Sequence, residues 1–242
     1  MKSHYRVVVI GGGVVGSSVL HHLAKFGWTD VVMLERSVLT AGSSWHAAGG
    51  IHALNAGPNM AALQAYTIDL LSEVEKESGQ NIGLHMTGGL TLVGTPERWE
   101  WLQANYRIFQ SIGIHDCELL APEEAQKRCP IMSTEGVIGA MWADREGYLD
   151  TTGTVHAYAT AAKKRGAEYY EHTKVESLAQ TADGWRVVTD KGTITCEHVV
   201  NAAGLWAKQV GRMAGIELPV SPLKHHYPVS YTHLTLPTIY SV

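Results

Sequence analysis

Apolar residues at the start of the chain follow two different periods. Residues 5–10 form a short run rich in β-branched side chains, which is typical of a buried parallel strand. Apolar positions over residues 19–26 then recur at helical spacing, and Gly27 follows where a helix would end. A second β-branched run covers residues 30–35. The pattern predicts a strand, a helix and a second strand, which is typical of an α/β fold.

The same two periods continue along the rest of the chain. Helical spacing predicts helices over residues 59–79, 96–113, 121–130 and 150–167, the last of which begins at Asp150 or Thr151 as N-cap. Strand patterns cover residues 88–95, 136–144, 167–180, 184–190 and 193–204. The last three are expected to form an antiparallel set, in which Asp190, Lys191 and Gly192 make a hairpin turn.

Composition limits the classes of protein and of partner. The 242 residues are enough for one large or two modest domains, and 45% hydrophobic with 17% charged residues is ordinary for a globular protein. A net charge of −4 offers no basic surface, so neither nucleic acid nor membrane is expected as a partner. The three cysteines form no C-x-x-C pair and no signal peptide is recognised, which predicts reduced thiols in a cytoplasmic protein. No metal site is predicted.

A glycine-rich turn joins the first strand to the first helix. Gly11, Gly13 and Gly16 fit the G-x-G-x-x-G pattern, which allows a tight turn, close approach of the backbone to a pyrophosphate, and close helix–strand packing. Glu35 ends the second strand, where a carboxylate accepts hydrogen bonds from ribose hydroxyls. The order of these elements predicts a dinucleotide site for FAD or NAD, although a glycine-rich turn also occurs in other α/β proteins. His21 and His22 are expected at the surface or in helix packing.

The segment "ERSVLTAGSSWHAAGG", residues 35–50, resembles the flavin-attachment segment of the dimethylglycine and sarcosine dehydrogenases. These belong to the D-amino-acid-oxidase-like group of FAD enzymes. The resemblance continues through "DREGYLDTTGTVHAYATAAKKRGAE" and "HVVNAAGLWAKQVGRMAG" and covers residues 5 to about 227. It implies an α/β fold in which a Rossmann-like FAD-binding domain is interrupted by part of an α+β substrate domain. The FAD-binding domain is expected over residues 1–80 and 146–220, and the partial substrate domain over 81–145 and 221–228.

The same resemblance implies a covalent flavin on His46, bonded to the 8α-methyl carbon of the ring. Small residues around His46 would let the loop lie along the isoalloxazine, and an imidazole is a competent nucleophile near neutral pH. Without the motif, a lone histidine of this kind would be read as a packing or solvent-facing residue. His52, which no tryptophan precedes, is expected to be structural.

Other cofactor contacts follow from the resemblance by position. They are Val14 and Val15 in the phosphate turn, Glu35 and Arg36 after the second strand, Gly42, Ser43, Ser44, Trp45, Ala47, Ala48 and Gly49 along the flavin, and Val175, Gly204 and Trp206 on the returning part of the chain. Taken alone, Val175 would be read as a core valine and Trp206 as a core aromatic residue.

The segment "PLKHHY" is similar to the one by which the family's chain enters the substrate domain. His225 is expected near the substrate amine as a base, with Tyr227 beside it. The implied reaction is oxidative demethylation of dimethylglycine, sarcosine or a similar N-methyl amine. Electrons would leave to an electron-transferring flavoprotein or to oxygen, and tetrahydrofolate would take the one-carbon unit in a longer protein.

Residues 229–242 depart from the family pattern. Residues 229–238 resemble a translated sequencing adapter, which predicts a non-native tail rather than a genuine short β-rich terminus. Three other functions remain open: an amino-acid oxidase with dissociable FAD, a non-catalytic regulatory homologue, and an NAD-binding module.

Overall fold

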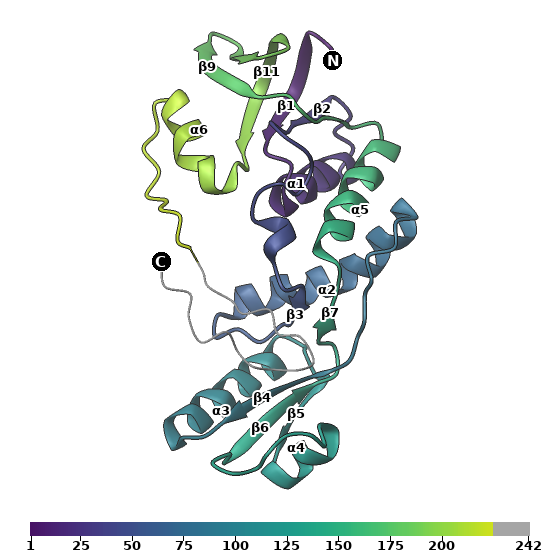
Figure 1. Cartoon of the computed structure of the whole chain (residues 1–242), viewed down its shortest axis with the longest axis vertical. Helices are drawn as coiled ribbons and strands as arrows, with labels where there is room; N and C mark the ends of the chain where they lie inside the picture. Colours follow the sequence, from purple (N-terminus) through teal and green to yellow (C-terminus); the bar gives the residue numbers. More distant parts are fainter. Residues whose placement is uncertain (225–242) are drawn as a thin grey trace, which may run out of the picture.

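The largest sheet of the protein is mixed and has six strands. The computed structural model describes residues 1–224, and Figure 1 shows this sheet at one end of the molecule. Its strand order is β8-β2-β1-β11-β10-β9. The strands are β1 (His4–Ile10), β2 (Val31–Leu34), β8 (Glu168–Tyr170), β9 (Val175–Thr181), β10 (Gly184–Thr189) and β11 (Gly192–Asn201). The first two strands and α1 (Val14–Lys25) form the strand–helix–strand unit that the sequence predicts.

Pairing within this sheet changes from parallel to antiparallel at β11. This strand runs parallel to β1, with Ile10 opposite Asn201, while its other edge pairs antiparallel with β10. Strand β8 pairs parallel with β2. The interpretation of residues 167–180 as a single antiparallel strand is therefore wrong. The chain ends one edge strand at Tyr170, crosses to the opposite edge and begins β9 at Val175.

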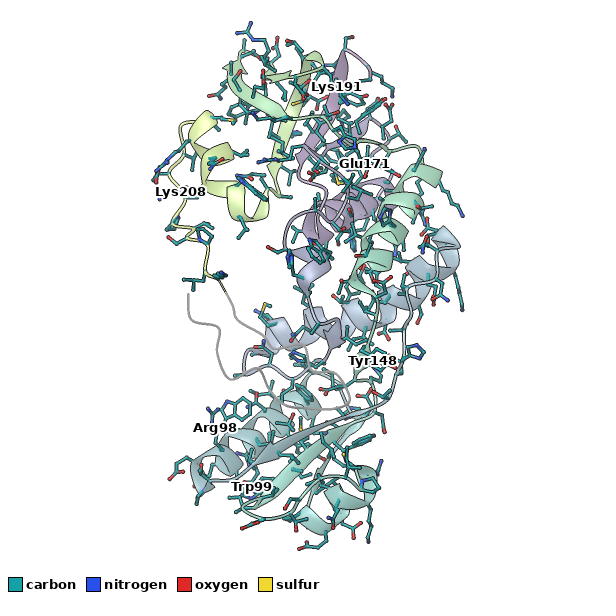
Figure 2. The ribbon with its side chains drawn as sticks, viewed as in Figure 1. Arg98, Trp99, Tyr148, Glu171, Lys191 and Lys208 are labelled. Carbon is teal, nitrogen blue, oxygen red and sulfur yellow. The ribbon has the colours of Figure 1, made fainter. Side chains whose placement is uncertain are left out.

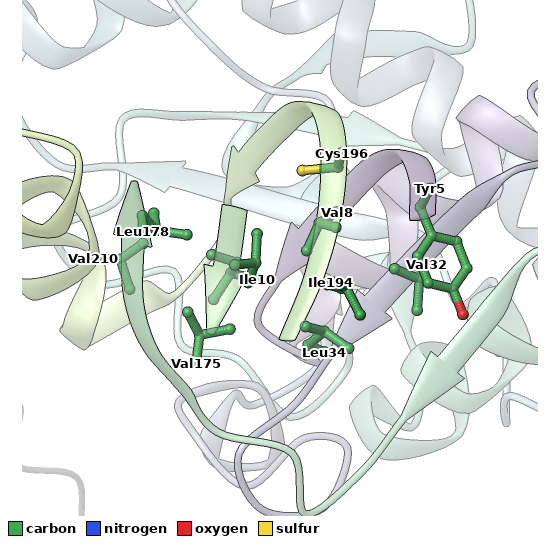
Figure 3. Close-up of a cluster of buried hydrophobic side chains, with 11 residues drawn as sticks. Tyr5, Val8, Ile10, Val32, Leu34, Val175, Leu178, Ile194, Cys196 and Val210 are labelled. Atoms are coloured by element: carbon green, nitrogen blue, oxygen red, sulfur yellow. The ribbon is translucent and has the colours of Figure 1, made fainter. Parts of the chain in front are cut away.

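Apolar side chains cover both faces of the six-stranded sheet. On one face, Val7 and Val9 pack against Leu20 of α1 and against the alanine-rich helix α5 (Thr151–Lys164). On the other, Val8 and Ile10 join residues of β9 and β10 in the cluster that Figure 3 shows. Strand β1 can be buried on both faces because its residues are mostly apolar, as is typical of parallel strands between two layers.

A smaller three-stranded antiparallel sheet lies at the opposite end of the molecule (Figure 1). Its order is β4-β6-β5, from β4 (Gly89–Val93), β5 (Cys117–Leu120) and β6 (Gly139–Ala143). Helices α3 (Pro96–Ser111) and α4 (Pro122–Arg128) accompany it, and Leu102 and Phe109 of α3 are buried against Met141. The sequence pattern predicts β4, β6 and both helices to within a few residues, whereas β5 was not predicted.

Helix α2 (Pro58–Ser78) and the two-stranded ribbon of β3 (Gly50–Ile51) and β7 (Gly147–Tyr148) lie between the two larger sheets (Figure 1). Leu70, Leu71 and Val74 of α2 pack against α5. Asp150 caps α5 by accepting a hydrogen bond from the Thr152 N–H at 2.9 Å, which confirms one of the two predicted caps. A last helix, α6 (Ala207–Met213), follows β11.

His21 is a fully buried histidine on α1, so its side chain belongs to helix packing rather than to the surface. Its ring packs 5.5 Å from that of Tyr158 on α5, and neither ring nitrogen has a hydrogen-bond partner among residues 1–224. Burial lowers the pKa of His21 from 6.5 to about 4, and the charge of Glu77 offsets part of that effect. His21 therefore remains neutral in the folded protein under conditions in which an exposed histidine is protonated.

This difference predicts a loss of stability in acid. Between pH 6.5 and about 4 the unfolded chain binds a proton at residue 21 and the folded chain does not, so the free energy of unfolding falls as pH falls. The full loss would be about 3 kcal/mol. Urea unfolding at pH 7 and pH 5 should show that His21→Leu is less sensitive to acid than the wild type. His198→Gln, which changes an exposed histidine, is the control, and its free energy of unfolding should fall between pH 7 and pH 5 as much as that of the wild type. An equally large fall in His21→Leu would contradict the lowered pKa of His21.

Candidate functional site

The glycine turn between β1 and α1 is built for close approach of backbone. A Cβ atom on Gly16 would lie 1.9 Å from the carbonyl oxygen of Gly11, and one on Gly11 would lie 2.4 Å from that of Ala202 on the segment after β11. Gly11 also has a φ of +115°, which side chains disfavour. The first turn of α1 therefore sits directly over the carboxyl ends of β1 and β11, where a helix N-terminus offers its free N–H groups to an anion.

Two exposed valines form the outer surface of this turn. Val14 and Val15 are 43% and 62% exposed although they begin a helix whose other apolar residues face the core. Apolar side chains around a set of free N–H groups suit a ligand that carries a phosphate and a flat, apolar remainder.

Glu35 lies beside the turn at the end of β2. One of its carboxylate oxygens accepts from the Gly12 N–H at 2.7 Å and the other from the Ser37 N–H at 2.8 Å. Each oxygen keeps a lone pair that can accept a ribose hydroxyl. Gly12 is a site residue that the three-glycine pattern does not include: a Cβ there would lie 2.8 Å from Cβ of Glu35, so this position also needs a residue without a side chain.

Backbone and carboxylate bonds fix the loop that follows Glu35. The Thr40 N–H donates to the Gly12 carbonyl at 3.0 Å, and Thr40 has a φ of +70°. The Leu39 N–H donates to the carboxylate of Glu171, which Figure 2 labels after β8. No signal in the sequence indicates Thr40 or Glu171, because each contributes through one hydrogen bond to the backbone of a segment that is distant in sequence.

Ser44 connects this loop to the phosphate turn. Its hydroxyl accepts from the Val14 N–H at 2.9 Å, so the short 3-10 helix η1 (Ser44–His46) begins at the N-terminus of α1. At the other end of the loop, Gly49 has a φ of +81°, and a Cβ there would lie 2.2 Å from the carbonyl oxygen of Leu149. The predicted flavin loop is thus held at both ends, against the phosphate turn and against the start of α5.

His46 lies exposed at the end of η1. Its Nδ1 is 3.1 Å from the carbonyl oxygen of Gly42, and its ring centroid is 3.8 Å from that of Trp45. A carbonyl oxygen only accepts, so this bond requires the proton on Nδ1 and leaves the lone pair on Nε2. The imidazole is therefore oriented, and its Nε2 is available as a nucleophile.

The remaining sequence-predicted cofactor residues lie on the returning part of the chain. The guanidinium of Arg36 stacks 4.8 Å from the ring of Trp206 in η2 (Gly204–Trp206), and that ring would contact a Cβ on Gly42 at 3.7 Å. Trp206, Arg36 and the flavin loop are thus brought together. Val175 is 8% exposed within the core cluster, so its side chain is part of the core. His225 and Tyr227 lie outside the described residues.

These features fit FAD on structural grounds. A Cβ would fill the cradle at Gly11 and Gly16, and hydrogen bonds attach two further segments to this turn. The carboxylate of Glu35 accepts from the Gly12 N–H, and Ser44 of the loop that carries His46 accepts from the Val14 N–H. Within residues 1–224, every helix is too short or too polar to cross a membrane, and no three metal-ligating side chains gather in one cluster. The fold and the site together define a dinucleotide-binding protein whose loop carries an available histidine.

Comparison with known proteins agrees with this class. Residues 6–240 match the family described as DAO, FAD dependent oxidoreductase. The chain is 38% identical to mitochondrial dimethylglycine dehydrogenase of Homo sapiens over 234 residues, and 34% identical to mitochondrial sarcosine dehydrogenase of Homo sapiens over 237 residues. These alignments cover 96% and 95% of this chain, but 27% and 26% of the two relatives. The chain therefore spans about a quarter of the length of these curated relatives.

A solved structure shows the same fold. L-proline dehydrogenase from P. horikoshii superposes with a TM-score of 0.83 at 30% identity, over 89% of this chain and 57% of that one. The chain belongs to the DAO family of FAD-dependent oxidoreductases. Membership decides between the two dinucleotides that the glycine turn leaves open, in favour of FAD. The family match reaches residue 240, and the assignment of residues 229–242 as a non-native tail stays a prediction.

Proposed function

We propose that the protein to which this chain belongs oxidises the C–N bond of an N-methyl amine, such as dimethylglycine or sarcosine, with FAD attached to His46. The observation that carries the proposal is the orientation of His46, whose Nδ1 is 3.1 Å from the Gly42 carbonyl beside the phosphate turn. Two relatives whose names specify dimethylglycine and sarcosine support the substrate class.

In this proposal the chain's own residues bind, orient and anchor the cofactor. Gly11, Gly13 and Gly16 would let backbone approach the pyrophosphate, Glu35 would accept from the ribose, and Nε2 of His46 would form the covalent bond. Bound FAD would supply the redox chemistry, which is the uptake of a hydride equivalent from the substrate. The oxidised substrate is an iminium, which water hydrolyses to formaldehyde and the demethylated amine.

Three finer parts of the proposal rest on the resemblance. These are a base at His225 with Tyr227 beside it, an electron-transferring flavoprotein or oxygen as acceptor, and tetrahydrofolate as the one-carbon acceptor. The cytoplasmic location also stays a prediction.

Anaerobic reduction of the flavin tests the substrate class. Dimethylglycine and sarcosine should bleach the visible absorbance of the oxidised flavin, whereas glycine and L-proline at equal concentration should leave it unchanged. Faster bleaching by glycine or proline would favour an amino-acid oxidase. A flavin that no amine bleaches would favour the non-catalytic regulatory homologue.

A further inference from the structure

A hollow opens beside the flavin loop, between the β3/β7 ribbon and the start of β4. Its volume is about 410 Å³, which suits a small ligand. The lining includes Gly50, Ile51, His52, Thr87, Trp101 and Glu146. Gly50 comes directly after Gly49, so the chain that would line the flavin continues into the wall of the hollow. Figure 2 shows the neighbouring Tyr148 of β7 at this junction between the two ends of the molecule.

Among residues 1–224, Glu146 supplies the one carboxylate in the lining of this hollow. Its side chain is half-buried and lies over the backbone of Gly89, where a Cβ would be 2.0 Å from Oε2. Across residues 1–224, its carboxylate has neither a hydrogen-bond donor nor an ion-pair partner. Burial raises the pKa of Glu146, while the nearby His52 lowers it. A half-buried carboxylate that no protein group pairs with can bind a cation that a ligand supplies.

The other side chains of the hollow suit a cation that carries methyl groups. Trp101 is 37% exposed, with the guanidinium of Arg98 5.8 Å from the centre of its ring, and Ile51 and Leu54 are apolar. Aromatic and apolar walls with one carboxylate are the surroundings in which methylated ammonium groups bind. His52 also lines the hollow and acts on Glu146 through its charge, but within residues 1–224 no ion pair joins the two side chains.

We propose that Glu146 binds the cationic nitrogen of the substrate in this hollow and so selects methylated ammonium compounds over neutral compounds of the same shape. The inference rests on the proposed function and adds the residue that recognises the amine. It assigns Glu146 to binding and assigns no proton transfer to it.

Calorimetric titration of the FAD-loaded protein with two matched compounds tests the role of Glu146. Trimethylglycine has a fixed positive nitrogen, and 3,3-dimethylbutanoate has a neutral carbon in its place. The wild type should bind trimethylglycine about tenfold more tightly, as expected for one electrostatic contact to a quaternary ammonium group. Glu146→Gln should lose this preference while its affinity for the neutral compound stays within about twofold.

Glu135→Gln is the matched control, because Glu135 is an exposed carboxylate that does not line the hollow. It should bind both compounds as the wild type does. Equal affinity of the wild type for the two compounds, failure to bind either, or a preference that survives in Glu146→Gln would overturn the inference. Flavin bleaching by N-methyl amines is measured separately, so a protein that is bleached but shows no role for Glu146 loses this inference and keeps the proposed function.

Discussion

Replacement of His46 by alanine should remove all flavin from the denatured polypeptide. Nε2 of His46 is the available nucleophile in the flavin loop, and alanine offers none. In a denaturing gel under ultraviolet light, the wild-type band should fluoresce and the His46→Ala band should be dark. The native mutant should still be yellow, because the glycine turn and Glu35 remain.

His52→Ala is the control, since His52 lies in the same segment but outside the flavin loop. It should retain the fluorescent band. A wild type that is yellow when native and dark in the gel would refute the covalent bond and leave a dissociable flavin.

Gly16→Ala should abolish tight binding of FAD. The added Cβ would lie 1.9 Å from the Gly11 carbonyl oxygen, and two backbone segments cannot yield as a flexible side chain can. Overpacking of this kind costs roughly 1–3 kcal/mol, and the same loss in binding free energy would raise the dissociation constant of FAD about fivefold to 150-fold. The measurement is fluorescence titration with FAD in the His46→Ala background, where binding is reversible.

Gly57→Ala in the same background is the matched control. A Cβ at this position would have its nearest neighbour at 3.5 Å, an ordinary contact. Its FAD affinity should stay close to that of His46→Ala alone. Equal affinities for Gly16→Ala and Gly57→Ala would show that the turn does not hold the cofactor.

The sequence predicts the parts of the fold that depend on local periodicity. Strand β1, helix α1 and strand β2 follow from the spacing of apolar residues, and the glycine turn follows from its pattern. The same reasoning gives a wrong prediction for residues 167–180, because β8 and β9 are close in sequence yet occupy opposite edges of the sheet. Which edge a strand joins is decided by tertiary pairing, on which the local pattern carries no information.

The residues of the candidate site also include some that the sequence indicates and some that only the fold shows. His46 and the glycines belong to motifs and are visible in the sequence. Gly12, Thr40 and Glu171 support the loop through hydrogen bonds between a backbone group and a distant segment, and no spacing rule identifies them. Glu146 can be identified only in the folded structure, where the β3/β7 ribbon and β4 together form the hollow that its carboxylate lines.

Mass spectrometry of the flavin-bearing peptide tests the central claim most directly. Trypsin should release residues 37–76 as one peptide, because no lysine or arginine lies between Arg36 and Lys76. This peptide holds both His46 and His52, so fragmentation is needed to locate the attachment. The account predicts FAD on the fragment that contains His46; an unmodified peptide, or FAD on His52, would contradict it.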